Sequence, residues 1–172
     1  MPNQTEQFQL FAGRKIAEIL EAEDRNDIYQ LLHSKMPSSV IFSKQIFDSE
    51  YVSFRLALGC LAWRKACFEN NIKEESIQKI FVRSALQIFE APKSLSQASA
   101  FSEYLYSEDG IQLNEEVVLL AERFLKRIAV SSKALKSQVE IQSLSVYLKT
   151  MVAIAESIRM SFQSEFLEVC SF

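Results

Sequence analysis

The stretch of sequence that decides the fold runs from Tyr51 to Phe68 and reads YVSFRLALGCLAWRKACF. Drawn as a helix, it carries apolar side chains on nearly every face, and a helix that is apolar all round is a buried one. Gly59 lies in its middle, where glycine costs about 1 kcal/mol relative to alanine. We therefore predict a buried helix that a neighbouring helix approaches closely at Gly59. Four polar residues interrupt the pattern: Ser53, Arg55, Arg64 and Lys65.

Glycine and proline are scarce in the rest of the chain, with three of each among 172 residues. Average usage gives roughly twenty such residues in a chain of this length. Turns and strand ends depend on them, so their scarcity favours long helices. We predict an all-α fold, a single-domain irregular helical bundle of about eight helices over residues 1–172. Two central apolar helices are expected at about residues 50–69 and 133–168.

The other breaks in apolar periodicity divide the chain into further helices. Pro37, Pro92 and Gly110 are expected to end helices, and Ser49 to cap the start of the central one. Asp24 or Asn26 is expected to cap the second helix. No repeat or low-complexity linker separates the segments. The six further helices are expected near residues 8–23, 24–35, 38–47, 73–90, 96–108 and 114–130.

The long last helix has a column of small hydroxyl residues at strict sevenfold spacing. We predict that this column runs inside an apolar arc wider than half the helix circumference, so that the helix is central or covers a partner. Close packing against another helix, a polar ligand groove and an oligomer seam all remain open as explanations. Glu165 interrupts the apolar run beside the column. The hydroxyl column consists of Ser143, Thr150, Ser157, Ser164 and Ser171, and its apolar neighbours are Val146, Ala153, Met160 and Leu167 on one side and Tyr147 and Ile154 on the other.

Charge and cysteine content bear on the compartment and on the partners. The formal net charge is −3 and the pI is about 5.4, which favours neither nucleic acid nor acidic membranes as partners. An odd cysteine count (Cys60, Cys67 and Cys170) forms no disulfide framework and favours a reducing cytoplasm. The most apolar long window, residues 144–162, contains three charged residues, so we expect no membrane span.

The motifs of common enzyme chemistries are missing from the sequence. It has one histidine, His33, and neither a phosphate-binding glycine loop nor a nucleophile elbow. Cys60, Trp63 and Cys67 fall on the segment predicted to be buried, so they are interpreted as core residues. The sequence therefore predicts no catalytic residue, no cofactor and no metal ligand, and it disfavours an enzyme.

One cluster of basic residues stands out as a candidate partner-binding patch. Between residues 123 and 139 there are five basic residues and no acidic one, at the junction of two predicted helices. Such a patch could bind an acidic partner or a phosphate, or could simply be a solvated surface. The five residues are Arg123, Lys126, Arg127, Lys133 and Lys136.

These observations favour a cytoplasmic helical interaction or regulatory protein that acts through protein–protein contacts, including self-association. The alternative is a sensor or carrier that binds an apolar small molecule in a phenylalanine-rich bundle core. For that alternative, the candidate apolar pocket is formed by Phe54, Phe68, Phe81 and Phe89.

Overall fold

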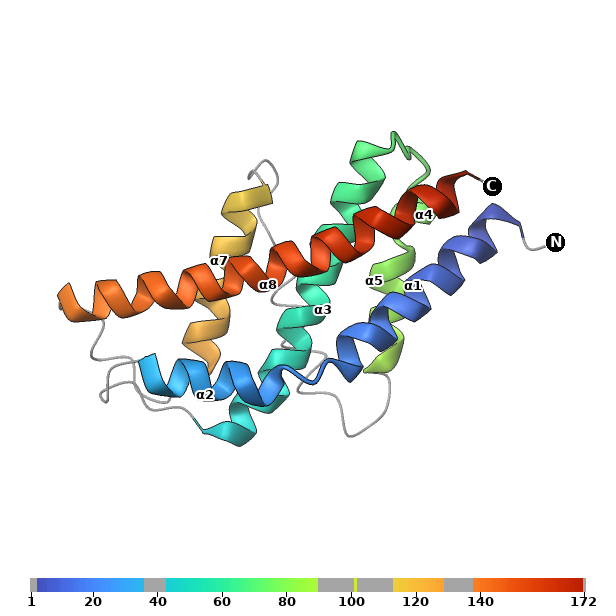
Figure 1. Cartoon of the computed structure of the whole chain (residues 1–172). Helices are drawn as coiled ribbons and strands as arrows, with labels where there is room; N and C mark the ends of the chain where they lie inside the picture. The colour runs from blue at the N-terminus through green and yellow to red at the C-terminus, as the bar shows by residue number, and fades with distance from the viewer. Residues whose placement is uncertain (1–2, 36–42, 90–100, 102–112, 129–137, 172) are drawn as a thin grey trace.

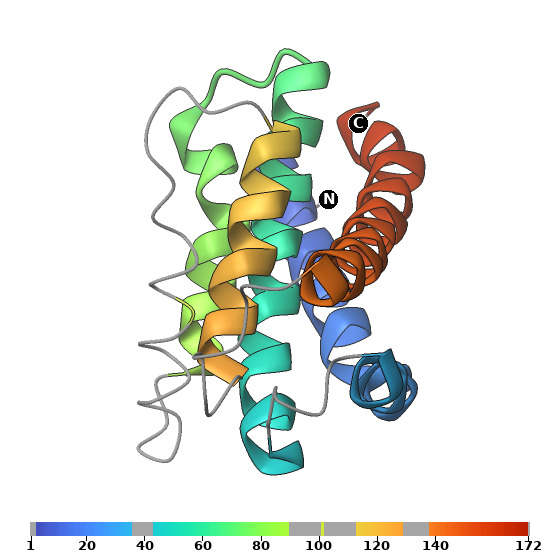
Figure 2. The same cartoon turned by 90° about the vertical axis from the view of Figure 1, so that its left-hand side faces the viewer.

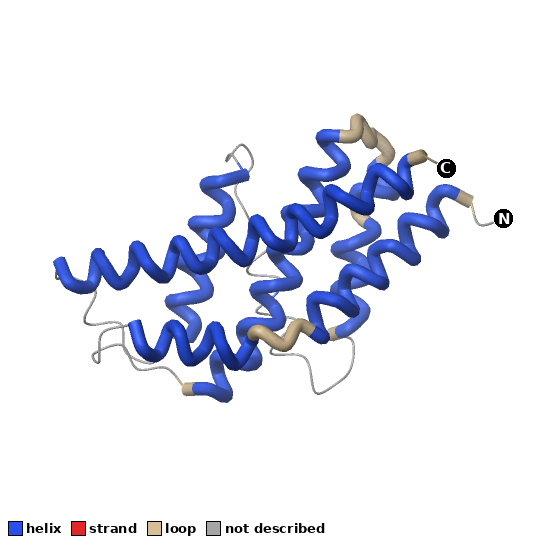
Figure 3. The backbone as a smooth tube through the Cα atoms, viewed as in Figure 1, coloured by secondary structure: helices blue, strands red, loops and turns tan. Residues whose placement is uncertain are grey.

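A computed structural model describes residues 3–35, 43–89, 101, 113–128 and 138–171, and all the regular structure among them is helical (Figures 1 and 3). The predicted all-α class is confirmed. The helices are α1 (Gln4–Glu21), α2 (Arg25–Lys35), α3 (Lys44–Glu69), α4 (Glu75–Gln78), α5 (Ile80–Ile88), α7 (Leu113–Ile128) and α8 (Gln138–Cys170). No helix among the described residues is long and apolar enough to cross a membrane.

The prediction of about eight helices is slightly wrong for the described part of the chain, which has six helices of nine or more residues and the single turn α4. Ser43 caps α3 by accepting a hydrogen bond from the Ile46 N–H at 3.1 Å. The helix then continues through Ser49, which was predicted to start a new one. The segment predicted near 73–90 instead divides at Lys79 into α4 and α5. Gly110, and all of the helix predicted near 96–108 except Phe101, lie outside the described residues.

Helix α3 is the centre of the bundle, as its sequence predicts, and packs against α1, α5, α7 and α8 (Figure 2). Gly59 allows the closest of these approaches. A Cβ atom there would lie 2.7 Å from Cζ of Phe81 in α5 and 2.9 Å from Cδ1 of Ile19 in α1. The prediction of a helix crossing at Gly59 is therefore confirmed. The helix ends at Asn70 and Asn71, and Asn71 adopts a left-handed φ of 56°.

Aromatic side chains fill the core in two clusters along α3. Near its C-terminal end, Trp63 contacts Phe8 and Phe11 of α1, Phe81 of α5 and Phe166 of α8 at centroid distances of 5.3–6.0 Å. Trp63 also donates a hydrogen bond to the Ile77 carbonyl at 3.1 Å. Ring pairs of this kind add stability beyond the area they bury. The second cluster, nearer the start of α3, consists of Tyr29, Phe47, Tyr51, Phe54 and Phe124.

Helix α8 lies along one side of the bundle and not at its centre, which corrects the prediction of two central helices (Figures 1 and 2). Helix α8 packs against α3, α7, α1 and α2, and its buried line consists of Tyr147, Met151, Ile154, Ile158, Phe162 and Phe166. Away from this line, Ser157 and Ser164 are exposed and Thr150 is half-buried, so no helix of the described part of the chain covers the hydroxyl column at Ser157 or Ser164. The apolar arc of α8 is wider than the strip that its neighbouring helices cover, so the remaining apolar side chains are exposed to solvent.

Candidate functional site

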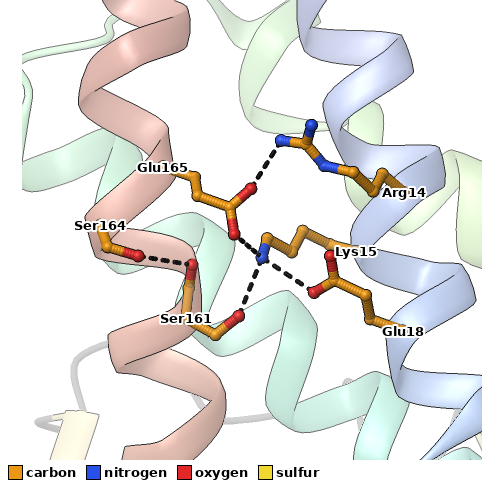
Figure 4. Close-up of polar contacts among 6 residues, drawn as sticks. All are labelled: Arg14, Lys15, Glu18, Ser161, Ser164 and Glu165. Carbon is orange, nitrogen blue, oxygen red and sulfur yellow. Dashed lines mark hydrogen bonds and ion pairs between the residues drawn. The ribbon is translucent and has the colours of Figure 1, made fainter.

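A cluster of polar contacts between α1 and α8 surrounds Lys15 of α1. Its side chain is 1% exposed, and its Nζ donates hydrogen bonds to three acceptors (Figure 4). These are Oε1 of Glu165 at 2.5 Å, Oγ of Ser161 at 2.8 Å and Oε2 of Glu18 at 2.8 Å. Arg14 adds an ion pair from Nη2 to the other Glu165 oxygen at 2.6 Å. Two helices distant in the sequence are thus joined by one buried ammonium group.

The Lys15 cluster is suited to holding α1 on α8 and not to catalysis. A lysine ammonium has three N–H donors, and each of them here has an acceptor. No donor of Lys15 is left for a substrate. The hydrogen bond from Lys15 holds the pKa of Glu165 below its ordinary value, because it stabilises the carboxylate. A general base or nucleophile would need the neutral amine. The sequence signal for the cluster was Glu165, the residue that interrupts an apolar run.

A second polar contact joins α3 to the segment before α2. Asp24 accepts a hydrogen bond from Nη1 of Arg55 at 2.5 Å and one from the Tyr51 hydroxyl at 3.3 Å. Burial raises the pKa of Tyr51 well above its ordinary value. The Asp24 backbone carbonyl accepts from the Ile28 N–H at 2.9 Å, at the start of α2. The sequence offered Asp24 or Asn26 as the cap of α2 and carried no local signal for the link from Asp24 to α3.

The predicted basic cluster is only partly within the described chain. Arg127 pairs through Nε with Glu50 of α3 at 2.7 Å, so it helps to hold α7 on α3. Lys126 is exposed and Arg123 is partly buried. Lys133 and Lys136 lie outside the described residues. A role for this patch in binding an acidic partner or a phosphate stays a prediction. Among its described residues, Lys126 is the most accessible to such a partner.

The four phenylalanines of the candidate apolar pocket lie in different surroundings. Phe54 stacks on Phe124 with centroids 4.6 Å apart. Phe81 contacts Trp63 and Phe162, and Phe89 contacts Phe101. Phe68, at the end of α3, is 81% exposed. The three buried rings are therefore packed against other aromatic side chains, and the fourth is on the surface.

The remaining residues singled out by sequence have ordinary structural positions. Cys60, Trp63 and Cys67 are buried, as predicted. Burial also raises the pKa of both thiols, that of Cys67 to about 12, so neither is a thiolate at neutral pH. His33 lies in the last turn of α2, with its ring 5.8 Å from that of Tyr29. Among the described residues, no group of three His, Cys, Asp or Glu side chains could hold a metal ion.

A groove of about 340 Å³ lies between α3, α7 and α8, and we refer to it as the three-helix groove. Its lining is mostly apolar, and it carries three charged groups: Lys65 of α3 and the Glu156–Arg159 ion pair of α8. An open cavity of this size and lining is typical of a site for a small apolar ligand. Its apolar lining residues are Leu58, Leu61, Ala62, Val117, Val118, Val152 and Ala155.

The second surface feature is the side of α8 that faces away from the core, which we call the outer face of α8. Its large apolar side chains are well exposed: Met160 by 63%, Leu167 by 57% and Val146 by 40%. An exposed row of apolar side chains on one helix is typical of an interaction surface. The outer face consists of Val146, Thr150, Ala153, Ser157, Met160, Ser164, Leu167 and Ser171.

Comparisons of the chain with protein-family models, with curated proteins and with solved structures found no match.

Proposed function

We propose that this chain is a cytoplasmic helical interaction or regulatory protein that acts through protein–protein contacts made by the outer face of α8. The exposure of Met160 and Leu167 carries the proposal. The other side of the same helix supplies core residues, so the helix is held rigidly while its outer face stays open to a partner. The buried, protonated thiols of Cys60 and Cys67 suit a reducing compartment.

A capture experiment with matched variants tests this proposal. The tagged protein and its Met160→Glu/Leu167→Glu variant are compared in lysate of the source organism by quantitative mass spectrometry. The control variant, Leu10→Glu/Phe68→Glu, places the same charges on exposed apolar positions of α1 and α3, which are 70% and 81% exposed.

Some proteins will be retained by both the wild type and the control variant. We expect the α8 variant to retain at least tenfold less of them. This comparison includes co-purified copies of the chain itself, which a second tag identifies. Equal retention by all three folded proteins would contradict the proposal.

The three-helix groove supports the alternative of a sensor or carrier of an apolar small molecule, but at a site that contains none of the four phenylalanines expected to form its pocket. Its apolar lining and volume of about 340 Å³ suit a short aliphatic ligand, and Lys65 and Arg159 lie within reach of a polar end group. Ligand-observed NMR with short-chain aliphatic alcohols and carboxylates tests this alternative. We expect binding by the wild type and by Ser145→Glu, which lies on α8 outside the groove, and loss of binding by Ala155→Phe, which fills it. Absence of binding across the series would contradict the alternative.

A further inference from the structure

The outer face of α8 has the residue spacing of a coiled-coil seam. Its residues follow one another in alternating steps of four and three from Val146 to Ser171. This is the spacing at which helices supercoil around one another. The buried line of α8 lies on another side of the helix, and every residue of the seam except the half-buried Thr150 is exposed.

The seam contains two kinds of residue in alternation. One set is apolar, with Val146, Met160 and Leu167 as its large members and Ala153 as its small one. The other set is formed entirely by small hydroxyl residues. A second copy of α8 running antiparallel brings each member of one set opposite a member of the other, because the two core positions of a heptad face each other in that orientation. A parallel copy would instead bring large residues opposite large ones and hydroxyls opposite hydroxyls.

One antiparallel register uses the whole seam. With the twofold axis between Ser157 and Met160, Met160 of one copy faces Ser157 of the other, and Leu167 faces Thr150. Each large side chain then meets a small one, and the same patch serves both copies, as a twofold interface requires. Flanking the seam in this register, Glu156 lies beside Gln163 of the second copy, so these positions oppose no like charges.

The hydroxyl groups can be covered at little cost, because most already donate hydrogen bonds within their own helix. Thr150 donates to the Val146 carbonyl at 2.9 Å, Ser171 to the Leu167 carbonyl at 2.7 Å and Ser164 to the Ser161 carbonyl at 3.3 Å. A polar group that keeps its hydrogen bond avoids most of the penalty of leaving water. The hydroxyl column is thus compatible with a closely packed helix interface.

The size of the seam sets the expected strength of the contact. From residue 146 to residue 171 it is about 38 Å long, and a helix with its side chains is about 10 Å wide. Two such strips bury about 760 Å² in total, which is below the standard range of about 1,200–2,000 Å². A dimer of this size is expected to dissociate on dilution.

We propose that two copies of this chain associate as an antiparallel pair of α8 helices, with the twofold axis between Ser157 and Met160. The inference rests on the proposed function, because it names the partner of the same outer face as a second copy.

Sedimentation equilibrium over a range of concentrations tests the association. We expect the mass to rise with concentration from 19.7 kDa toward twice that value. The Met160→Glu/Leu167→Glu variant should raise the dissociation constant at least tenfold, and the control Leu10→Glu/Phe68→Glu should leave it within twofold. A mass of one chain at every concentration overturns the proposal, as does a dimer that both variants weaken equally. Capture of a different protein by the outer face of a monomeric chain would overturn it while sustaining the proposed function.

Cysteine crosslinking tests the orientation. In a Cys170→Ser background, differently tagged Ser157→Cys and Met160→Cys proteins are mixed and mildly oxidised. Facing positions lie within the Cα separation of a disulfide. Identical positions are offset by about 4.5 Å along the axis. We therefore expect the mixed dimer to exceed either self-linked dimer at least fivefold. A predominance of self-linked dimers would show a parallel pair and overturn the proposed register.

Discussion

Helices α3 and α8 are the two longest described, with 26 and 33 residues, yet they are buried in different ways. Helix α3 has neighbours around it, and its Gly59, Trp63 and Phe54 all lie against other helices. Helix α8 is covered along one line and exposes Met160 and Leu167 on the other side. An apolar arc in a sequence thus indicates how much surface could be covered, without indicating what covers it.

The largest expected effect comes from removing the ring at the centre of the α3 packing. Trp63→Ala should lower the free energy of unfolding by about 4 kcal/mol, as for other buried aromatic truncations. Urea denaturation followed by far-ultraviolet circular dichroism measures this change. Phe68→Ala is the control on the same helix, since Phe68 is 81% exposed. A loss for Trp63→Ala no greater than that of the control would contradict the packing.

A side chain at the helix crossing should be nearly as damaging. Gly59→Leu places a Cβ 2.7 Å from the ring of Phe81, and overpacking of this kind costs about 3 kcal/mol. Gly13 of α1 is the matched control, because a Cβ there meets nothing within 4 Å. Gly13→Ala should stabilise the fold by about 0.5–1 kcal/mol through its helix propensity. Thermal unfolding of both variants measures the contrast, and equal shifts would contradict the crossing.

The attachment of α8 to α1 should weaken in acid. The pKa of Glu165 is lowered in the folded state, chiefly by the hydrogen bond from Lys15, so its contribution is present above the ordinary carboxyl value of 4.5. It is lost as the pH falls through the lower, folded-state value. Glu165→Gln should therefore be less stable than the wild type at pH 7, and the difference should shrink toward pH 3.

Urea midpoints across this pH range provide the measurement. Glu75→Gln is the control, because Glu75 pairs with Lys79 on an exposed helix surface, where an ion pair contributes little. A Glu165→Gln difference that is the same at pH 7 and pH 3 would show that charge plays no part in the attachment.

The smallest expected effect lies on the outer face of α8. Ser157→Leu should change the free energy of unfolding by less than about 0.5 kcal/mol, because Ser157 is exposed. This reverses the expectation for a hydroxyl column covered by a neighbouring helix, in which a leucine would destabilise the fold. Urea denaturation at low protein concentration distinguishes the two, and a loss above 1 kcal/mol would show that the column is covered.

The parts of the fold that sequence predicted well depend on local patterns. The apolar pattern of residues 51–68 and the glycine at position 59 were sufficient to predict the buried part of α3 and its crossing, but not its start at Lys44. The Lys15 cluster was not predictable, because Lys15 and Glu165 are 150 residues apart and only the interruption at Glu165 was visible. Arg127 likewise pairs with Glu50, 77 residues away, which no local charge pattern reveals.

Exposure was the other quantity that sequence could not supply. Phe68 follows the apolar pattern of α3 but lies in its last turn, where it reaches solvent. The hydroxyl column of α8 was placed correctly between two apolar columns, of which one faces the core and the other solvent. The burial of a side chain depends on which helices pack against its side of the helix, and this packing is determined by the tertiary structure of the whole chain.

The position of Trp63 gives the molecule an optical reporter of the packing of its own helices. It is the single tryptophan of the chain, and its indole meets rings from α1, α5 and α8 at once. Displacing any of these helices brings water to the indole and shifts its emission to longer wavelength. Association through the outer face of α8 leaves that surrounding untouched. The emission of Trp63 therefore reports loosening of the bundle and does not respond to dissociation of two copies.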